Sequence, residues 1–226
     1  MKNIIFTFLT ATTLAIPSFA NLLTNGNFDT TDSRVGLVNN RQLNSLSGNW
    51  DVYTSIPGWS TQSGNGIEVQ ASGTVVNAHS GNLYIELDSH PNRTNSGSTN
   101  SSMFQTLNLG IGDYILSFWY RPRTNTPNDN GIQVRLDNDV LLNLNATTSQ
   151  GNTWAQYSAN FSILAAGNRN LTFAATGIAN QLGGFIDTVS LTGGNNTGTA
   201  ENVPEPATFA LLGVSLIGIA IKLRRR

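Results

Sequence analysis

Residues 154–163 read WAQYSANFSI, in which small or apolar residues alternate with polar ones after the initial Trp-Ala pair. Successive side chains of a β-strand point to opposite faces, so this stretch predicts a strand with one buried and one solvated face. Ile132, Val134 and Leu136 alternate with polar neighbours in the same way. Seven further runs have a strand-like pattern: 66–70, 83–88, 103–109, 114–121, 140–144, 171–176 and 185–192.

These short strands are separated by turns rich in Gly, Asn and Asp, and the body of the chain shows no helical periodicity. The pattern predicts an all-β fold, an antiparallel β-sandwich formed by one domain over residues 21–192. The sequence Asp137-Asn138-Asp139 predicts a hairpin turn, because Asn and Asp tolerate a positive φ. Residues 30–47 and 90–100 are expected to form long loops.

The composition excludes several classes of function. The chain of 226 residues has no cysteine, which removes thiol nucleophiles, cysteine-ligated zinc and disulfides. Five of its 12 Lys and Arg residues, and one of its 13 acidic residues, lie in the terminal segments. The body keeps seven arginines and twelve acidic residues, a net charge of −5 with no lysine. A nucleic-acid partner is therefore not expected, since phosphate binding requires a basic surface.

The N-terminus predicts a secretory signal peptide over residues 1–20. Lys2 precedes an apolar stretch from residue 4 to 16, and small residues end the segment, with cleavage predicted between Ala20 and Asn21. The Sec translocon and signal peptidase are the partners that this segment requires. The alternative, a retained membrane anchor, is less favoured because the apolar stretch is shorter than the ~20 residues that span a bilayer.

The C-terminus combines a proline motif, an apolar segment and a basic tail. A polar linker over residues 193–202 leads to Val203, Pro204, Glu205 and Pro206, the core of a motif that extends to residue 208. A transmembrane helix is predicted at about 207–223; its apolar part, 15 residues, has a length of roughly 22 Å. The basic tail 222–226 contains Lys222, Arg224, Arg225 and Arg226, and should stay in the cytoplasm. The prolines hold Glu205 in extended chain outside the membrane.

This arrangement, over residues 203–226, resembles the PEP-CTERM sorting signal of Gram-negative bacteria. The resemblance implies cleavage near the motif by exosortase, a membrane enzyme of bacteria that make exopolysaccharide and live in biofilms. It also implies a single-pass inner-membrane stage with the body in the periplasm, followed by release to the cell surface or the medium. An ordinary C-terminal anchor, the alternative, would account for the apolar segment and the arginines but not for Pro204-Glu205-Pro206.

Several phrases of the body resemble galactose-binding-like jelly-roll domains of extracellular proteins. They occur in order at 25–29 (NGNFD), 56–59 (IPGW), 84–88 (YIELD), 116–121 (LSFWYR) and 185–191 (FIDTVSL). Asp187 shares its predicted strand face with Phe185, Val189 and Leu191, and a buried carboxylate must be hydrogen-bonded or bound to a metal. The resemblance implies a structural calcium held by Asp29 and Asp187. The alternative is that Asp187 accepts backbone N–H bonds, and no other cofactor is expected.

The resemblance also implies carbohydrate binding, which needs aromatic rings and planar polar groups. The candidate ligand-binding residues are Trp50, Tyr53, Trp59, Arg121 and Arg123. Tryptophans of a sandwich can instead belong to the core, and Trp119 and Trp154 are expected to be packing residues.

The sequence contains no catalytic motif, so an enzyme is not expected. Glu68 and Glu86 could form a glycosidase pair, but both alternate with apolar neighbours and are expected to point to solvent. Asp88 and His90 are two residues apart, a spacing within a strand that could bring their side chains into contact. The leading hypothesis is an exported envelope or matrix protein that associates with exopolysaccharide. Two alternatives stay open: a glycan-active hydrolase that uses Glu68, Glu86 or Asp88, and a structural adhesin without a glycan pocket.

Overall fold

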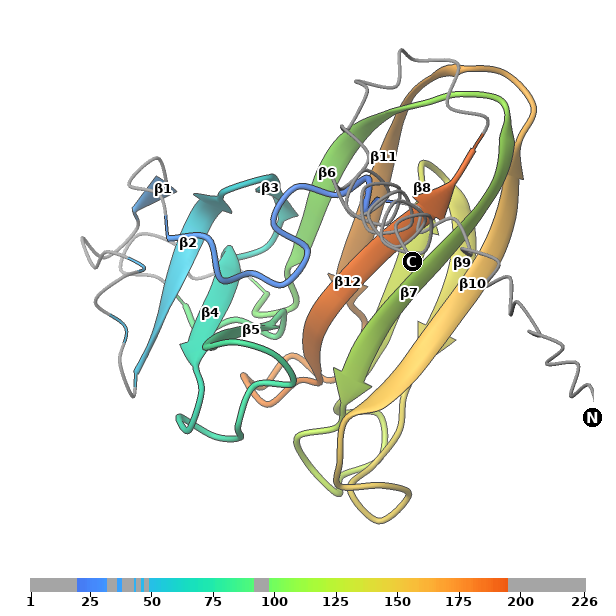
Figure 1. Ribbon diagram of the computed structural model, residues 1–226. Helices are drawn as coiled ribbons and strands as arrows, with labels where there is room; N and C mark the ends of the chain where they lie inside the picture. Colours follow the sequence, from blue (N-terminus) through green and yellow to red (C-terminus); the bar gives the residue numbers. More distant parts are fainter. Residues whose placement is uncertain are drawn as a thin grey trace, which may run out of the picture.

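The part of the chain that a computed structural model describes forms twelve β-strands (Figure 1). The structure describes residues 20–31, 36–37, 43, 46, 49–91 and 98–194. The strands are β1 (Gly36–Leu37), β2 (Trp50–Ile56), β3 (Trp59–Ser63), β4 (Ile67–Ala71), β5 (Leu83–Glu86), β6 (Ser102–Leu109), β7 (Gly112–Arg121), β8 (Ile132–Leu136), β9 (Asp139–Leu144), β10 (Ala155–Ile163), β11 (Gly167–Ala175) and β12 (Phe185–Gly193).

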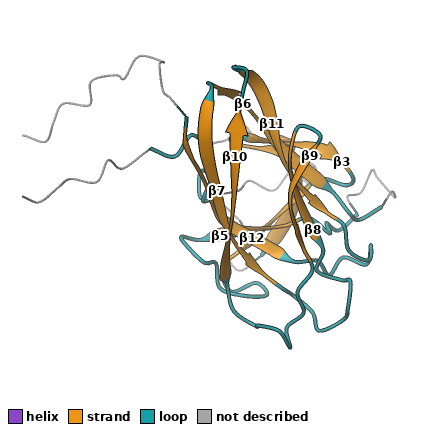
Figure 2. Cartoon of the chain, turned by 90° about the vertical axis from the view of Figure 1, so that its right-hand side faces the viewer, coloured by secondary structure: helices purple, strands orange, loops and turns teal. Residues whose placement is uncertain are grey.

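All the pairings between these strands are antiparallel, and they follow the order β10-β7-β12-β5-β4-β2-β3-β6-β11-β8-β9, with β1 beside β2. The connection between β2 and β3 consists of only two residue pairs, Ser55 with Ser60 and Ile56 with Trp59. At this corner the sheet turns back on itself, so that β10 to β2 form one layer and β3 to β9 form the other (Figures 1 and 2). We call the first the β5 layer and the second the β11 layer.

The hydrophobic core lies between the two layers. Phe118 of β7 packs edge-on against Phe173 of β11, with 5.1 Å between the ring centroids. Trp59, which is 1% exposed, packs against Phe173 from the corner strand β3. Both layers therefore present one apolar face inward, as the period-2 pattern predicts.

All nine strands predicted from the sequence are present, so the all-β sandwich is confirmed. The turn at Asp137 is confirmed too: its φ is 51°, and β8 pairs with β9 on either side of it. The strands β1, β2 and β3 were not predicted. In β2, the three consecutive residues Asp51, Val52 and Tyr53 are all buried, because both faces of this strand are covered, so no alternation marks it.

A β-bulge in β12 corrects one prediction. The register to β7 shifts between Asp187 and Ser190, and Thr188 has a φ of 50°. The extra residue places Val189 in the core together with Ile186, while Asp187 lies on the opposite face. The expectation that Asp187 shares a face with Val189 is therefore wrong.

The predicted signal peptide, sorting motif and basic tail lie outside the described residues, apart from Ala20. So do most of the linker 193–202, most of the loop 30–47 and residues 92–97 of the second loop. In the part of the chain that the structure describes, no helix is long and apolar enough to cross a membrane.

Candidate functional site

The outer face of the β5 layer, the face turned away from the core, holds an unusual set of polar and aromatic side chains. Strand register sets Trp50 of β2 beside Gln70 of β4, and Gln70 beside Tyr84 of β5. Further along the layer, Asp187 of β12 lies beside Trp119 of β7. A second row runs parallel to the first and contains Val52, Glu68, Glu86, Phe185 and Arg121.

Two glutamates form the centre of this face. Glu68 and Glu86 are register partners on β4 and β5, and both are fully buried. The side-chain amide of Gln70 donates to both carboxylates, at 2.8 Å to Oε1 of Glu68 and 2.5 Å to Oε2 of Glu86. The hydroxyl of Tyr84 donates in turn to Oε1 of Gln70 at 2.7 Å. One hydrogen-bonded network therefore joins the two strands.

The buried charges of this network are compensated from the loops. One guanidinium nitrogen of Arg123 donates to both oxygens of Glu86, at 2.7 and 2.6 Å, and the N–H of Gly183 donates to Oε1 at 2.7 Å. The backbone N–H and the Nδ1 of His90 both lie 2.8 Å from Oε2 of Glu68. Burial, together with the neighbouring charge of Glu68, raises the pKa of Glu86, against the lowering effect of Arg123.

The expectation that Glu68 and Glu86 point to solvent is wrong, because loop residues cover both. Their oxygens are engaged by Gln70, His90, Arg123 and Gly183, so neither carboxylate can reach a substrate in this conformation. Asp88 is also buried and does not meet His90; its Oδ2 accepts the N–H groups of residues 180 and 182. The three acids named for a hydrolase therefore act as structural anchors for loops.

Aromatic residues flank the polar centre on both sides. The indole of Trp50 stacks on the imidazole of His90, with centroids 4.2 Å apart, and that of Trp119 stacks on His79 at 3.8 Å. Trp154 packs edge-on against His79 at 6.3 Å, and its Nε1 donates to the carbonyl of residue 77. Burial lowers the pKa of His79, which keeps its ring neutral at pH 7. The three indoles are each partly exposed.

The structure separates the five predicted ligand-binding residues. Trp50, Arg121 and Arg123 belong to the outer face and are partly exposed, whereas Tyr53 and Trp59 are each 1% exposed in the core. Nε1 of Trp59 donates to the carbonyl of residue 25, which explains how its polar atom is satisfied there. Neither of the two core rings offers a face to a ligand.

Asp29 and Asp187 both accept hydrogen bonds from the backbone of the same short loop, residues 79–83. Oδ1 of Asp29 accepts the N–H groups of Asn82 and Leu83 at 2.7 and 3.1 Å. Oδ2 of Asp187 accepts those of His79 and Ser80, at 2.8 and 3.1 Å. Burial raises the pKa of Asp187 to about 6, despite these hydrogen bonds.

This arrangement does not fit the calcium ion implied by the resemblance. Calcium takes six to eight oxygen ligands, whereas the groups that face these two carboxylates are N–H donors. The second oxygen of each is engaged too, Oδ2 of Asp29 by the amide of Asn27 and Oδ1 of Asp187 by the N–H of Thr188. The structure favours the alternative, a pair of hydrogen-bonded carboxylates that hold one loop.

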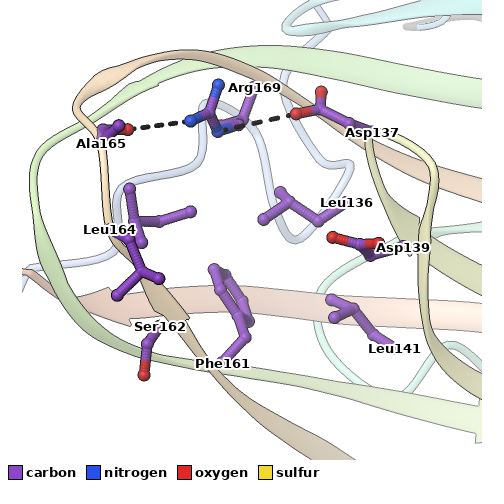
Figure 3. Close-up of a pocket in the computed structure, with 10 residues that line it drawn as sticks. Leu136, Asp137, Asp139, Leu141, Phe161, Ser162, Leu164, Ala165 and Arg169 are labelled. Carbon is purple, nitrogen blue, oxygen red and sulfur yellow. Dashed lines mark hydrogen bonds and ion pairs between the residues drawn. The ribbon is translucent and has the colours of Figure 1, made fainter.

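A groove lies elsewhere, between the edge strands β9 and β10 (Figure 3). Its volume is about 470 Å³, and its apolar lining includes Leu141 and Phe161. Arg169 and Asp137 form a loose ion pair at its rim, with 3.6 Å between nitrogen and oxygen. None of the five predicted ligand-binding residues lines this groove.

The C-terminal segment, residues 202–226, matches the family described as the PEP-CTERM protein-sorting motif. The chain carries a PEP-CTERM sorting motif. Such a motif implies an exported protein that is first anchored in the membrane and then processed by exosortase. The match covers the C-terminal segment alone and leaves the β-sandwich unclassified.

Comparison with curated protein sequences finds no match. Solved structures with a related arrangement include TmCBM61 in complex with β-1,4-galactotriose, at 19% identity, 76% and 97% coverage of the two chains and a TM-score of 0.46. The CBM22-1 xylan-binding domain of Xyn10C from Paenibacillus barcinonensis has 13% identity, 79% and 97% coverage and a TM-score of 0.46. The arabinose-bound α-L-arabinofuranosidase MgGH51 has 16% identity and a TM-score of 0.48; 77% of this chain aligns with 26% of that one.

Sequence reasoning missed the stacking roles of His79 and His90. The sequence did contain a signal for the buried network. Glu68 and Gln70 are two residues apart and therefore share one face of their strand, and Tyr84 and Glu86 do the same on the next strand. Pairing these two strands brings four polar side chains onto one face. The pairing itself, however, could not be read from the sequence.

Proposed function

We propose that this protein is an exported component of the cell envelope or extracellular matrix that binds exopolysaccharide through the outer face of its β5 layer. The signal peptide would direct it through the Sec translocon, and the C-terminal helix would hold it in the inner membrane until exosortase cuts near Pro204, Glu205 and Pro206. The body would then act at the cell surface or in the surrounding matrix, without catalytic chemistry.

The observation that supports this proposal is the position of the aromatic residues. Three of the four tryptophans, Trp50, Trp119 and Trp154, lie on this one face and are partly exposed, and both histidines of the chain stack against them. If these tryptophans served only in packing, we would expect them to be divided between the two layers. A polysaccharide extends over several sugar rings, so separated aromatic plates on one face suit a chain-like ligand.

The surrounding polar groups fit the same ligand. Sugar recognition combines ring stacking with planar hydrogen-bonding groups. The guanidinium of Arg121 lies beside the aromatic residues, where its Nη2 donates to the amide of Asn152 at 3.2 Å. Beneath them, the network of Glu68, Gln70 and Glu86 holds the strands rigidly, so that little freedom would be lost on binding.

A direct test is affinity electrophoresis in gels that contain exopolysaccharide purified from the producing bacterium. We expect the wild-type protein to be retarded, and Trp50→Ala and Trp154→Ala each to weaken the retardation. Ile111→Ala, which removes a side chain that is 56% exposed in the turn between β6 and β7, is the matched control and should migrate as the wild type. Equal retardation of all four proteins would refute binding through this face.

Processing is tested separately. Replacing Pro204, Glu205 and Pro206 together by alanine should leave full-length protein in the inner membrane of an exosortase-positive strain. Deleting exosortase should give the same result with the wild-type chain. Unchanged release of the triple variant would contradict the assigned cleavage region.

A further inference from the structure

Strand β10 is an open edge of the sandwich. It pairs with β7 over nine consecutive residues without a register shift, and no other strand that the structure describes pairs with its opposite side. β10 and the other terminal strand, β9, run along the side of the molecule that faces the viewer in Figure 2. A row of backbone N–H and C=O groups is therefore available along β10.

Devices that usually block such an edge are missing from β10. Natural edge strands carry charges, prolines, glycines or bulges that prevent pairing with another chain. Residues 155–163 contain no charged residue, no proline and no glycine. The other terminal strand differs, because β9 begins with Asp139 and its ladder to β8 has a register shift at Val134 and Arg135.

The sequence of β10 is chemically symmetric about Ala159. The neighbours of Ala159 are Ser158 and Asn160, both polar and exposed, and the next pair is Tyr157 and Phe161, both aromatic and partly buried. Beyond these lie Gln156 and Ser162, and then Ala155 and Ile163. Two copies aligned antiparallel with Ala159 opposite Ala159 would pair polar residues with polar ones and aromatic rings with aromatic rings.

We infer that two copies of this protein associate through antiparallel pairing of their β10 strands, centred on Ala159, to form one continuous sheet. The same register sets Leu164, which is 86% exposed, opposite Trp154 of the other copy, and so covers an apolar side chain that otherwise lies in solvent. The twofold axis makes the contact self-limiting, since each copy uses the same edge for it. Two copies of the body, each with a net charge of −5, repel one another, and this repulsion is weakest where they meet through a strand without charged residues.

The absence of cysteine from the chain permits a specific test. In the proposed dimer, position 159 is the only position of β10 that lies opposite itself, at a cross-strand distance close to that of a disulfide. The full-length protein carrying Ala159→Cys, expressed with its own signal peptide, should form a disulfide-linked dimer upon oxidation in the periplasm. Gln156→Cys, which would face residue 162, and Thr106→Cys on the outside of β6 should remain monomeric.

A second variant connects the cross-link to strand pairing. Ser158 is exposed and faces Asn160 of the other copy, so Ser158→Lys adds two lysines to one dimer contact. Combined with Ala159→Cys, it should abolish the dimer band without changing the thermal unfolding midpoint. The inference is overturned if Ala159→Cys stays monomeric, or if the three single-cysteine variants cross-link equally. It is also overturned if the thiol introduced at the exposed position 156 is protected from maleimide in a monomer, which would show that the chain covers its own edge.

Discussion

Replacing Arg123 by methionine tests the buried network most directly. The side chain of Arg123 is 16% exposed and that of Glu86 is fully buried, and the guanidinium donates to both carboxylate oxygens. Methionine keeps much of the packing volume but removes the charge, so Glu86 is left buried with only the hydrogen bonds of Gln70 and Gly183. Breaking a buried ion pair from one side costs about 3–5 kcal/mol of unfolding free energy.

The matched control is the same substitution at Arg169. This arginine lies 3.6 Å from Asp137, and their side chains are 29% and 43% exposed. Exposed pairs of this kind contribute less than about 1 kcal/mol. Urea denaturation of the β-sandwich body, produced without the sorting segment, should therefore give a much larger loss for Arg123→Met than for Arg169→Met. The loss should shrink as the pH is lowered, because a protonated Glu86 needs no counter-ion. Equal losses for the two variants would refute the assignment of Arg123 as the compensating charge.

Three further predictions concern the hydrogen bonds by which Asp29 and Asp187 hold loop 79–83. Burial raises the pKa of Asp187 from 3.8 to about 6, so its contribution to folding is fully present below pH 3.8 and is lost as the pH rises through 6. The unfolding free energy should therefore fall by about 3 kcal/mol between pH 3 and pH 7.5, a dependence that Asp187→Asn removes in denaturant titrations. Gly81 and Gly73 both have a positive φ, but a Cβ at Gly81 would collide with the carboxylate of Asp29, whereas one at Gly73 meets nothing. Gly81→Ala should therefore lower the unfolding free energy by about 1.5–3 kcal/mol more than Gly73→Ala. Equal losses would contradict the contact between Asp29 and this loop. A calcium chelator should leave the thermal unfolding midpoint unchanged, and a marked rise upon adding calcium chloride would restore the metal hypothesis.

The sequence was sufficient for strands in which one face is wet. β10 and β8 alternate over their whole length, and both were predicted nearly to the residue. It was insufficient for β2, where burial on both faces leaves three consecutive buried residues and no alternation. In β4 the alternation was present and the strand was predicted, but the burial of its outer face under loops was not. Glu68 and Glu86 were misjudged for the same reason: an alternating polar residue predicts a solvated position only if nothing packs over it.

The bulge at Thr188 limited the prediction of the site in another way. A period-2 pattern carries no mark of an inserted residue, so Asp187 was assigned to the face of Val189 and Leu191. The jelly-roll phrases pointed to Asp29 and Asp187 as calcium ligands, whereas in the structure both carboxylates accept backbone N–H groups of one loop. What they could not supply was the loop between them, whose N–H groups occupy the carboxylate oxygens.

The central position of β12 determines how the body would respond to mechanical load. This strand is the last described element before the C-terminal segment, and it is bonded on one side to β5 and on the other to β7. The N-terminal segment is fastened to the same strand, since the side chain of Asn21 bonds residues 189 and 191. A pull transmitted from the membrane along β12 would shear two ladders at once instead of peeling one strand from an edge. The strand that leads to the anchor should therefore resist mechanical unfolding better than an edge strand of the sandwich would.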